Sequence, residues 1–335
     1  MACLVSHCHH RVLLITKIGF GVLAIERSRV AIGARTVQGV SPELLQRTRR
    51  SVRHLVRPYP LRDLPAGTML DLPGRGQTFV TDSGPKDAPA VILLHSVLTT
   101  GLLCWYPVIP ALNERYRVIT LDHRRHGRGI ASPDFSLDDA ADDTVAVADV
   151  LGVDRFTAAG FSMGGGIAQL IWRRHPGRLN GMVLCSTGPF FSEQDPRVQA
   201  IADKVGRFSA PVYRVLPKST RLDDIGAHTT VWAFRQFLST SLADFGMFGE
   251  GLGRFDSRDW LGDIDVPTSV VVSTRDKVVP PARQQLLLDG IPGARRFEVP
   301  GGHACCVLGA EDFIEPFGAA VDVAAGRVTP VPPSR

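Results

Sequence analysis

Three residues far apart in the sequence have the types and the setting needed for nucleophilic catalysis, beginning with Ser162. Ser162 lies in the segment GFSMG at 160–164, after a short apolar run and before a glycine-rich stretch with helical spacing. A GxSxG turn between a strand and a helix needs small residues beside the serine, since strand and helix cross closely there, and it exposes the hydroxyl. Ser162 is therefore the predicted nucleophile.

A serine hydroxyl is a weak nucleophile until a base removes its proton, and that base needs an orienting group. Asp276 lies in the loop STRDKVVP at 273–280 after an apolar run, and His303 follows the next such run in PGGH at 300–303. The interval between them fits one helix and one strand, which would bring both loops to the sheet edge that carries Ser162. The order Ser, Asp, His predicts a catalytic triad of Ser162, Asp276 and His303. The alternatives, a solvated loop acid and a capping or core histidine, account for less of the pattern.

Backbone N–H groups near Ser162 could stabilise the oxyanion that forms when a carbonyl is attacked. Met163 stands at the predicted helix start, and Val97 follows the apolar run that ends in LLHS at 93–96. We therefore expect an oxyanion hole made by the N–H groups of Val97 and Met163. His95 is interpreted as a hydrogen-bonding residue that fixes this loop rather than as a second base, although contact with the substrate is also open for it.

Short β-branched runs alternate with helical segments over most of the chain. The runs are near-continuously apolar, as expected for parallel strands covered on both faces, so the sequence predicts a doubly wound, mostly parallel α/β sheet. The predicted strands are Gln77–Thr81, Val91–His95, Val118–Asp122, Phe156–Phe161, Met182–Ser186, Ser269–Thr274 and Arg296–Val299, and the predicted helices are Leu137–Leu151, Gly164–His175 and Ala282–Leu288. The segment Pro58–Gly76, rich in proline and glycine, is predicted to be a linker.

Residues 188–260 break the alternation, and we expect a mostly helical insertion there. Ligand pockets of α/β proteins lie over the carboxyl edge of the sheet, so apolar residues of the insertion could line one. The alternative is that its aromatic side chains only pack the insertion onto the core. The predicted substrate-binding residues are His95, Phe161, Trp232, Phe237 and Phe248.

Composition and charge narrow the function classes. Hydrophobic residues make up 44% and charged residues 21%, which is typical of a globular protein. The net charge of +5 is concentrated at residues 1–62, which hold eleven Lys or Arg and two acids, while the remainder is mildly acidic. A general nucleic-acid-binding surface is therefore not expected. The six scattered cysteines include no CxxC pair, so a reducing compartment is favoured and no metal site is predicted.

The N-terminal arm, residues 1–62, allows two interpretations. The apolar run Val12–Ile25 has 14 residues, fewer than the roughly 20 that a bilayer requires. The segment from Pro42 to Arg57 has the pattern of a basic amphipathic helix. Such a helix could touch an anionic membrane, or could pack on the catalytic domain by one face, which we favour. We predict a cytoplasmic protein, with membrane association through the arm as the alternative and the oligomeric state open.

In combination, the motifs GFSMG, LLHS and RDKVVP…GGH resemble those of the α/β-hydrolase superfamily, and LDHRRHGRG at 121–129 is similar to its turn after the fourth strand. The resemblance covers residues 77–325. Residues 188–260 stand where the family carries its cap, so we predict an α/β-hydrolase core at 63–187 and 261–325, a helical cap at 188–260 and a flexible tail at 326–335. The resemblance also implies Ser162 as nucleophile, His303 as base and then acid, Asp276 as orienting acid, and Val97 and Met163 as oxyanion donors.

Two positions depart from the family pattern. Ser96 stands where a glycine usually follows the histidine, and Arg125 stands where the turn usually has glycine. If position 96 requires a positive φ, serine would cost about 1–2 kcal/mol in backbone strain.

These observations predict a serine hydrolase that needs no cofactor and cleaves a carboxylic ester, or a thioester or amide, with an apolar acyl group through an acyl-enzyme. Two alternatives stay open. One is a C–C bond hydrolase or perhydrolase-like enzyme with the same triad, and the other is a ligand-binding receptor that keeps the fold without turnover.

Overall fold

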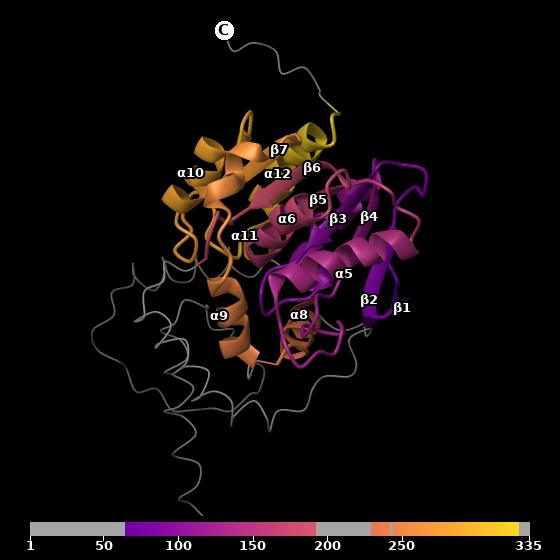
Figure 1. Ribbon diagram of the computed structural model, residues 1–335. Coiled ribbons are helices and arrows are strands. Elements are labelled where there is room, and N and C mark those ends of the chain that lie inside the picture. The colour runs from indigo at the N-terminus through magenta and orange to yellow at the C-terminus, as the bar shows by residue number, and fades with distance from the viewer. Residues whose placement is uncertain (1–63, 192–228, 242–243, 328–335) are drawn as a thin grey trace, which may run out of the picture. The chain divides into compact units, whose positions relative to one another are not determined.

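The computed structural model describes residues 64–191, 229–241 and 244–327 (Figure 1). Its centre is an eight-stranded sheet with the strand order β1-β2-β4-β3-β5-β6-β7-β8. All neighbouring strands from β4 to β8 pair in parallel, and β2 is antiparallel to both β1 and β4. The strands are β1 (Gly67–Leu72), β2 (Gly76–Ser83), β3 (Ala90–Leu94), β4 (Arg117–Leu121), β5 (Phe156–Phe161), β6 (Leu179–Cys185), β7 (Thr268–Ser273) and β8 (Arg295–Val299).

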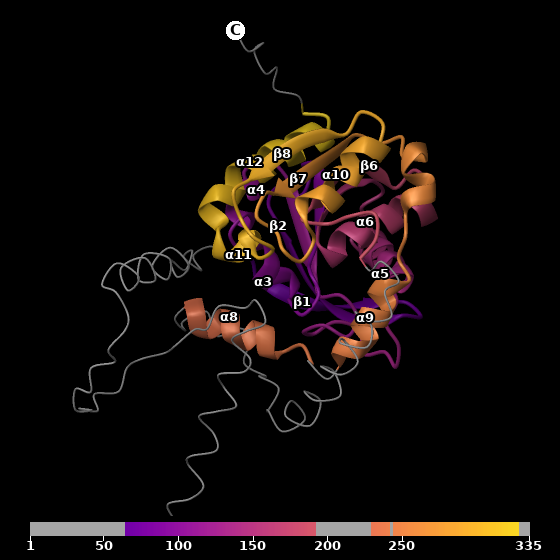
Figure 2. The same ribbon diagram turned by 90° about the vertical axis from the view of Figure 1, so that its left-hand side faces the viewer.

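Helices cover both faces of the sheet, as Figures 1 and 2 show. Successive residues of β3 point into two different cores: Ile92 and Leu94 pack with α5, α6 and α10, whereas Val91 and Leu93 pack with α3, α4 and α12. The predicted doubly wound α/β architecture is confirmed. The helices are α3 (Gly101–Trp105), α4 (Ile109–Asn113), α5 (Leu137–Val150), α6 (Met163–Arg174), α8 (Thr229–Leu238), α9 (Phe245–Gly253), α10 (Pro281–Gly290), α11 (Cys305–Leu308) and α12 (Ala310–Ala324), with a 3₁₀-helix, η2 (Arg258–Asp263).

The structure differs from the sequence prediction at the N-terminal side of the sheet. The predicted linker Pro58–Gly76 contains strand β1, which pairs with β2 as a hairpin. Gly74 and Gly76 have φ of 74° and 113°, so glycines that suggested a linker instead form the hairpin turn. The linker prediction is therefore wrong for the residues of β1. Helices α3, α4, α11 and α12 were not predicted, since three of them are very short and α12 contains Pro316.

The predicted helical insertion is described in part. Helices α8 and α9 both lie at the same end of the sheet, on opposite sides of it in Figure 2 (Figures 1 and 2). Residues 192–228 and 242–243 of the insertion lie outside the described residues. The N-terminal arm at 1–62, including the predicted helix Pro42–Arg57, and residues 328–335 of the tail lie outside them too.

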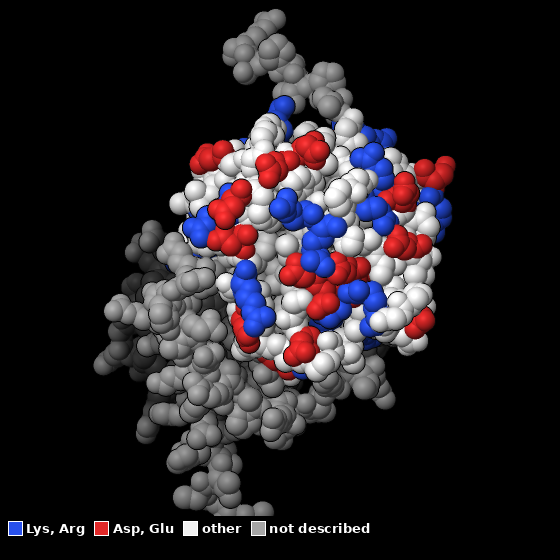
Figure 3. Space-filling model, in the orientation of Figure 1, with Lys and Arg blue, Asp and Glu red and all other residues white. Residues whose placement is uncertain are grey.

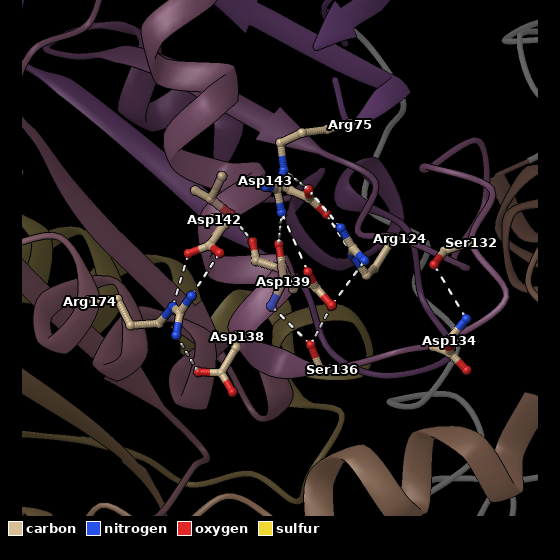
Figure 4. A network of polar contacts seen from close by, with 12 residues as sticks. Arg75, Arg124, Ser132, Asp134, Ser136, Asp138, Asp139, Asp142, Asp143 and Arg174 are labelled. Carbon is tan, nitrogen blue, oxygen red and sulfur yellow. Dashed lines mark hydrogen bonds and ion pairs between the residues drawn. The ribbon is translucent and has the colours of Figure 1, made fainter. Parts of the chain in front are cut away.

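The first two turns of α5 carry a network of ion pairs that joins three other parts of the core (Figure 4). Buried Asp143 forms ion pairs with Arg75 of the β1–β2 turn at 2.5 Å and with Arg124 of the turn after β4 at 2.7 Å. Asp142 and Asp138 pair with Arg174 of α6 at 2.8 and 3.3 Å. The charges on this face of the molecule are accordingly intermixed (Figure 3).

Among the helices that the structure describes, none has the length and the apolar character needed to cross a membrane.

Candidate active site

The turn between β5 and α6 holds Ser162 in a strained conformation with φ of 53° and ψ of −115°. The two glycines of GFSMG are required by close packing. A Cβ at Gly160 would lie 2.1 Å from the carbonyl oxygen of Gly164, and a Cβ at Gly164 would lie 2.1 Å from that of Leu94. Strand, turn and helix therefore approach as closely as the sequence argument supposed, and the turn presents the Ser162 hydroxyl at the sheet edge.

The three side chains predicted to act together lie in hydrogen-bond contact. His303 Nε2 lies 2.9 Å from Ser162 Oγ, and His303 Nδ1 lies 2.7 Å from Asp276 Oδ2. Because a carboxylate only accepts, Nδ1 carries the proton, and Nε2 offers its lone pair to the serine hydroxyl. The arrangement can move a proton from Ser162 to His303, while the fully buried carboxylate of Asp276 stabilises the imidazolium.

The loop of Asp276 is held rigidly at both ends. Asp276 Oδ1 accepts the backbone N–H groups of Val278 and Val279 at 2.8 and 2.9 Å. Gln284 of α10, which is fully buried, accepts the N–H of Ser273 before the loop and donates to the carbonyl of Val279 after it. The carboxylate therefore has one fixed oxygen, so only the other can face His303.

Buried hydroxyl and thiol groups connect the strands beneath the site. Ser186, directly after β6, lies 2.6 Å from Ser273 at the end of β7, and Ser273 Oγ lies 3.1 Å from Cys305 Sγ. Burial raises the pKa of the Cys305 thiol to about 11, so the group stays protonated at neutral pH. These residues and Gln284 are not predicted from the sequence, because no motif marks them.

The loop after β3 carries the predicted oxyanion donor Val97. Among the described residues, no acceptor is bonded to the Val97 N–H, and the Met163 N–H, as the first of α6, has no acceptor within its helix. Ser96 does not have a positive φ, so serine carries no backbone strain at this position. The left-handed residue of this loop is Leu98, with φ of 62°. Arg125, the other departure from the family pattern, does adopt a left-handed conformation, with φ of 66°.

His95 lies beneath this loop and is fully buried. Its Nε2 accepts the His123 N–H at 2.8 Å, so its Nδ1 carries the proton and donates to the carbonyl of Ser96 at 2.7 Å. The rings of His123 and His126 lie 4.3 and 5.1 Å from the His95 ring. Burial lowers the pKa of His95 well below its usual value, that of His123 to about 3 and that of His126 to about 4, so all three are neutral at pH 7.

The aromatic residues predicted to contact substrate lie in packing positions. Phe161 packs against Trp105 and Phe313, Trp232 of α8 packs edge-on against Tyr106, and Phe248 of α9 stacks on His126. These three side chains are buried, and Phe237 is half-buried against both cores. Trp232, Phe237 and Phe248 join the insertion to the core, whereas Phe161 packs within the core. The contact of these residues with substrate stays a prediction.

Within the described residues, no group of three or more His, Cys, Asp or Glu side chains could hold a metal ion.

The doubly wound sheet, the strained serine turn after β5 and the loops that reach it define the class of protein. The family model of the α/β-hydrolase fold matches residues 89–238. The chain belongs to the α/β-hydrolase family, and it is a hydrolase.

Several individual proteins are similar to this chain over most of its length. The protein assigned as carbamate hydrolase RutD of Caulobacter segnis is 37% identical over 252 residues, which cover 69% of this chain and 91% of the relative. The 3-oxoadipate enol-lactonase 1 of Acinetobacter baylyi is 24% identical over 248 residues, covering 72% and 92% of the two chains. The crystal structure of the enol-lactonase from Burkholderia xenovorans aligns with a TM-score of 0.62 and 25% identity, covering 75% of this chain and 98% of that one.

Proposed function

We propose that this protein is a serine hydrolase that cleaves a carboxylic ester through an acyl-enzyme. The observation that carries the proposal is the continuous hydrogen-bonded series from Ser162 through His303 to Asp276, with distances of 2.9 and 2.7 Å. A nucleophile, a base and an orienting group in this order are what acyl transfer requires.

In the proposed reaction, Ser162 Oγ adds to the ester carbonyl as His303 Nε2 takes its proton. Asp276 holds the imidazole by its Nδ1 and stabilises the positive charge. When the tetrahedral intermediate collapses, the C–O bond to the alcohol breaks and His303 gives the proton to the leaving oxygen. Water then attacks the acyl-enzyme with His303 again as base, and the carboxylic acid leaves as Ser162 recovers its proton.

The N–H groups of Val97 and Met163 are the proposed oxyanion donors. Met163 follows Ser162 directly in the sequence. Val97 lies in the loop after β3, which ends beside the serine turn because β3 pairs with β5 and Leu94 pairs with Gly160. Neither N–H is used by regular secondary structure, which leaves them available to a developing negative charge.

The relatives support an ester-like bond as the one cleaved. Two of them are enol-lactonases, and a lactone is a cyclic ester. A carbamate is the second candidate, favoured by the 37% identity to the protein assigned as RutD. The proposal includes a preference for an apolar acyl group.

The test is covalent labelling with a fluorophosphonate, followed by hydrolysis assays. We expect the wild type to be labelled and Ser162→Ala to be unlabelled, with His303→Ala labelled at least about 100-fold more slowly. A panel of p-nitrophenyl esters of graded acyl length, an aliphatic lactone and an aryl carbamate then ranks the substrates. A folded wild type that is never labelled and cleaves none of the panel would contradict the proposal and favour the receptor alternative.

A further inference from the structure

The loop Ser96–Thr100, which carries the proposed oxyanion donor Val97, is held at both ends by hydrogen bonds that lead to residues distant in sequence. At its start, His95 and Thr99 both donate to the carbonyl of Ser96, at 2.7 and 2.8 Å. His95 is held in turn by the N–H of His123 from the turn after β4. The start of the loop thus depends on the core alone.

The end of the loop depends on the insertion. Thr100 caps α3 by accepting the Leu103 N–H at 3.1 Å, and its hydroxyl proton is donated to Gln236 Oε1 of α8 at 2.8 Å. Thr100 and Gln236 are each only 1% exposed. A buried hydroxyl that loses its acceptor carries a desolvation cost, so this contact constrains the loop strongly.

The part of the insertion that carries Gln236 is itself attached to the core at further points. Thr240 Oγ1 accepts the Gly127 N–H at 3.1 Å, and Arg125 pairs with Asp244 at 2.7 Å. Gly127 and Arg125 belong to the turn after β4, the same turn that supplies the N–H bound to His95. Hydrogen bonds and an ion pair therefore link the end of the loop to α8, the segment after α8 to this turn, and this turn back to His95 at the start of the loop.

We propose that Gln236 is a positioning residue for the oxyanion hole: through Thr100 it holds the loop in the place where the Val97 N–H meets the developing oxyanion. The inference rests on the proposed function. It assigns the insertion a part in the chemical step.

The consequence for the reaction is specific to the transition state. Losing an oxyanion donor costs about 100- to 1,000-fold in rate, and a displaced donor costs less than an absent one. A residue that only shapes the substrate pocket would change binding of substrate and transition state alike, and so would act on KM. Gln236 should act on kcat.

The test compares Gln236→Met, which keeps the shape of the side chain without its acceptor, with the wild type in hydrolysis of p-nitrophenyl butyrate. We expect kcat to fall by about 5- to 50-fold with KM changed by less than about twofold. The Ki of an alkyl trifluoromethyl ketone, which forms a serine-bound oxyanion, should rise by about the same factor as kcat/KM falls. Gln285→Met, the same substitution on α10, should leave all three quantities at their wild-type values.

Thr100→Ala and the double variant test the contact itself. If the Thr100–Gln236 bond is what matters, the double variant should lose no more than about twofold beyond the worse single variant. Gln236→Glu keeps an acceptor oxygen and should recover part of the lost kcat. If Gln236→Met fails to fold, Thr100→Ala and Gln236→Glu still test the inference.

Three results would overturn the inference: an unchanged kcat in folded Gln236→Met, a rise confined to KM, or fully additive losses in the double variant. Each of them, with a wild type that is labelled by fluorophosphonate, leaves the proposed function standing. A wild type that is neither labelled nor active overturns both.

Discussion

Asp276 presents only one of its carboxylate oxygens to His303. Oδ2 lies 2.7 Å from His303 Nδ1, while Oδ1 accepts the N–H groups of Val278 and Val279. Because the carboxylate cannot rotate without breaking two backbone hydrogen bonds, it fixes both the ring orientation and the tautomer of His303. The lone pair of Nε2 thereby stays directed at Ser162.

Asp276→Asn should keep this geometry and remove the function of the carboxylate. An amide can donate to Nδ1, which favours the tautomer with the proton on Nε2 and leaves Ser162 without a base. We expect kcat for an ester substrate to fall by about 1,000- to 10,000-fold with little change in KM. Steady-state kinetics at pH 7.5 measure this. Asp289→Asn, on the exposed surface of α10, is the matched control, and a loss of less than about tenfold in Asp276→Asn would remove Asp276 from the proposed triad.

Gly164→Ala should disrupt the turn of the proposed nucleophile. A Cβ there would lie 2.1 Å from the backbone oxygen of Leu94, which cannot move without shifting β3. We expect a loss of about 1–3 kcal/mol in the free energy of unfolding, together with loss of fluorophosphonate labelling. Gly249→Ala in α9 is the control, since a Cβ there meets nothing within 4 Å and alanine favours a helix. Urea unfolding of both variants would contradict the argument if Gly164→Ala were as stable as the wild type.

The sequence predicts those parts of the site that local patterns mark. The segment GFSMG identifies its own turn, because small residues must flank the serine, and the order of Ser162, Asp276 and His303 follows from alternating strands and helices. Phe156–Phe161 matches β5 in both of its bounds, and the other six predicted strands differ from the observed ones by at most three residues at either end.

Residues that act through partners far along the chain escape such patterns. Gln236 is 136 positions from Thr100, and Ser186 is 87 from Ser273, so no periodicity or spacing links them. The prediction that His95 supports its loop needed only the neighbouring residues. That His123 and His126 join it could be found only once the turn after β4 was folded against β3.

The buried histidines predict acid sensitivity of the fold. Because the pKa values of His95, His123 and His126 are lowered in the folded state, the unfolded chain binds more protons below pH 6.5, and stability falls as pH falls from there toward 4. Each histidine contributes up to about 1.4 kcal/mol per pH unit in that window. Urea unfolding at pH 7.5, 6.5 and 5.5 measures the slope.

His123→Leu should make this slope smaller by the share of one histidine. Both ring nitrogens of His123 are buried without a hydrogen-bond partner among the described residues, so leucine removes no such bond. Its backbone N–H, which binds His95, is retained. If the wild type and His123→Leu lost the same free energy of unfolding between pH 7.5 and 5.5, the histidine cluster would not be the source of the acid sensitivity.

Asp143→Asn should destabilise the junction of α5 with the β1–β2 turn and the turn after β4 (Figure 4). Asp143 is 1% exposed and pairs with both Arg75 and Arg124, so neutralising it removes the buried counter-charge of two guanidinium groups and leaves them only the more exposed Asp139. We expect a loss of about 3 kcal/mol in the free energy of unfolding. The control is Asp149→Asn, where an exposed carboxylate pairs with Arg178 and the expected loss is below about 1 kcal/mol. If the two variants lost the same free energy of unfolding, the buried ion pairs of Asp143 would contribute no more to stability than the exposed pair of Asp149.

Arg125 combines an unfavourable backbone with a favourable side-chain contact, and two substitutions separate them. Its φ of 66° is costly for any residue with a Cβ, whereas its guanidinium pairs with Asp244 and donates to the carbonyl of Ser132. Arg125→Ala and Arg125→Gly both remove the side-chain contacts, and only the glycine also removes the strain. We expect the glycine variant to be more stable than the alanine variant by about 1 kcal/mol in urea unfolding. Equal stabilities would show that the turn relaxes away from the left-handed conformation once the ion pair to Asp244 is lost.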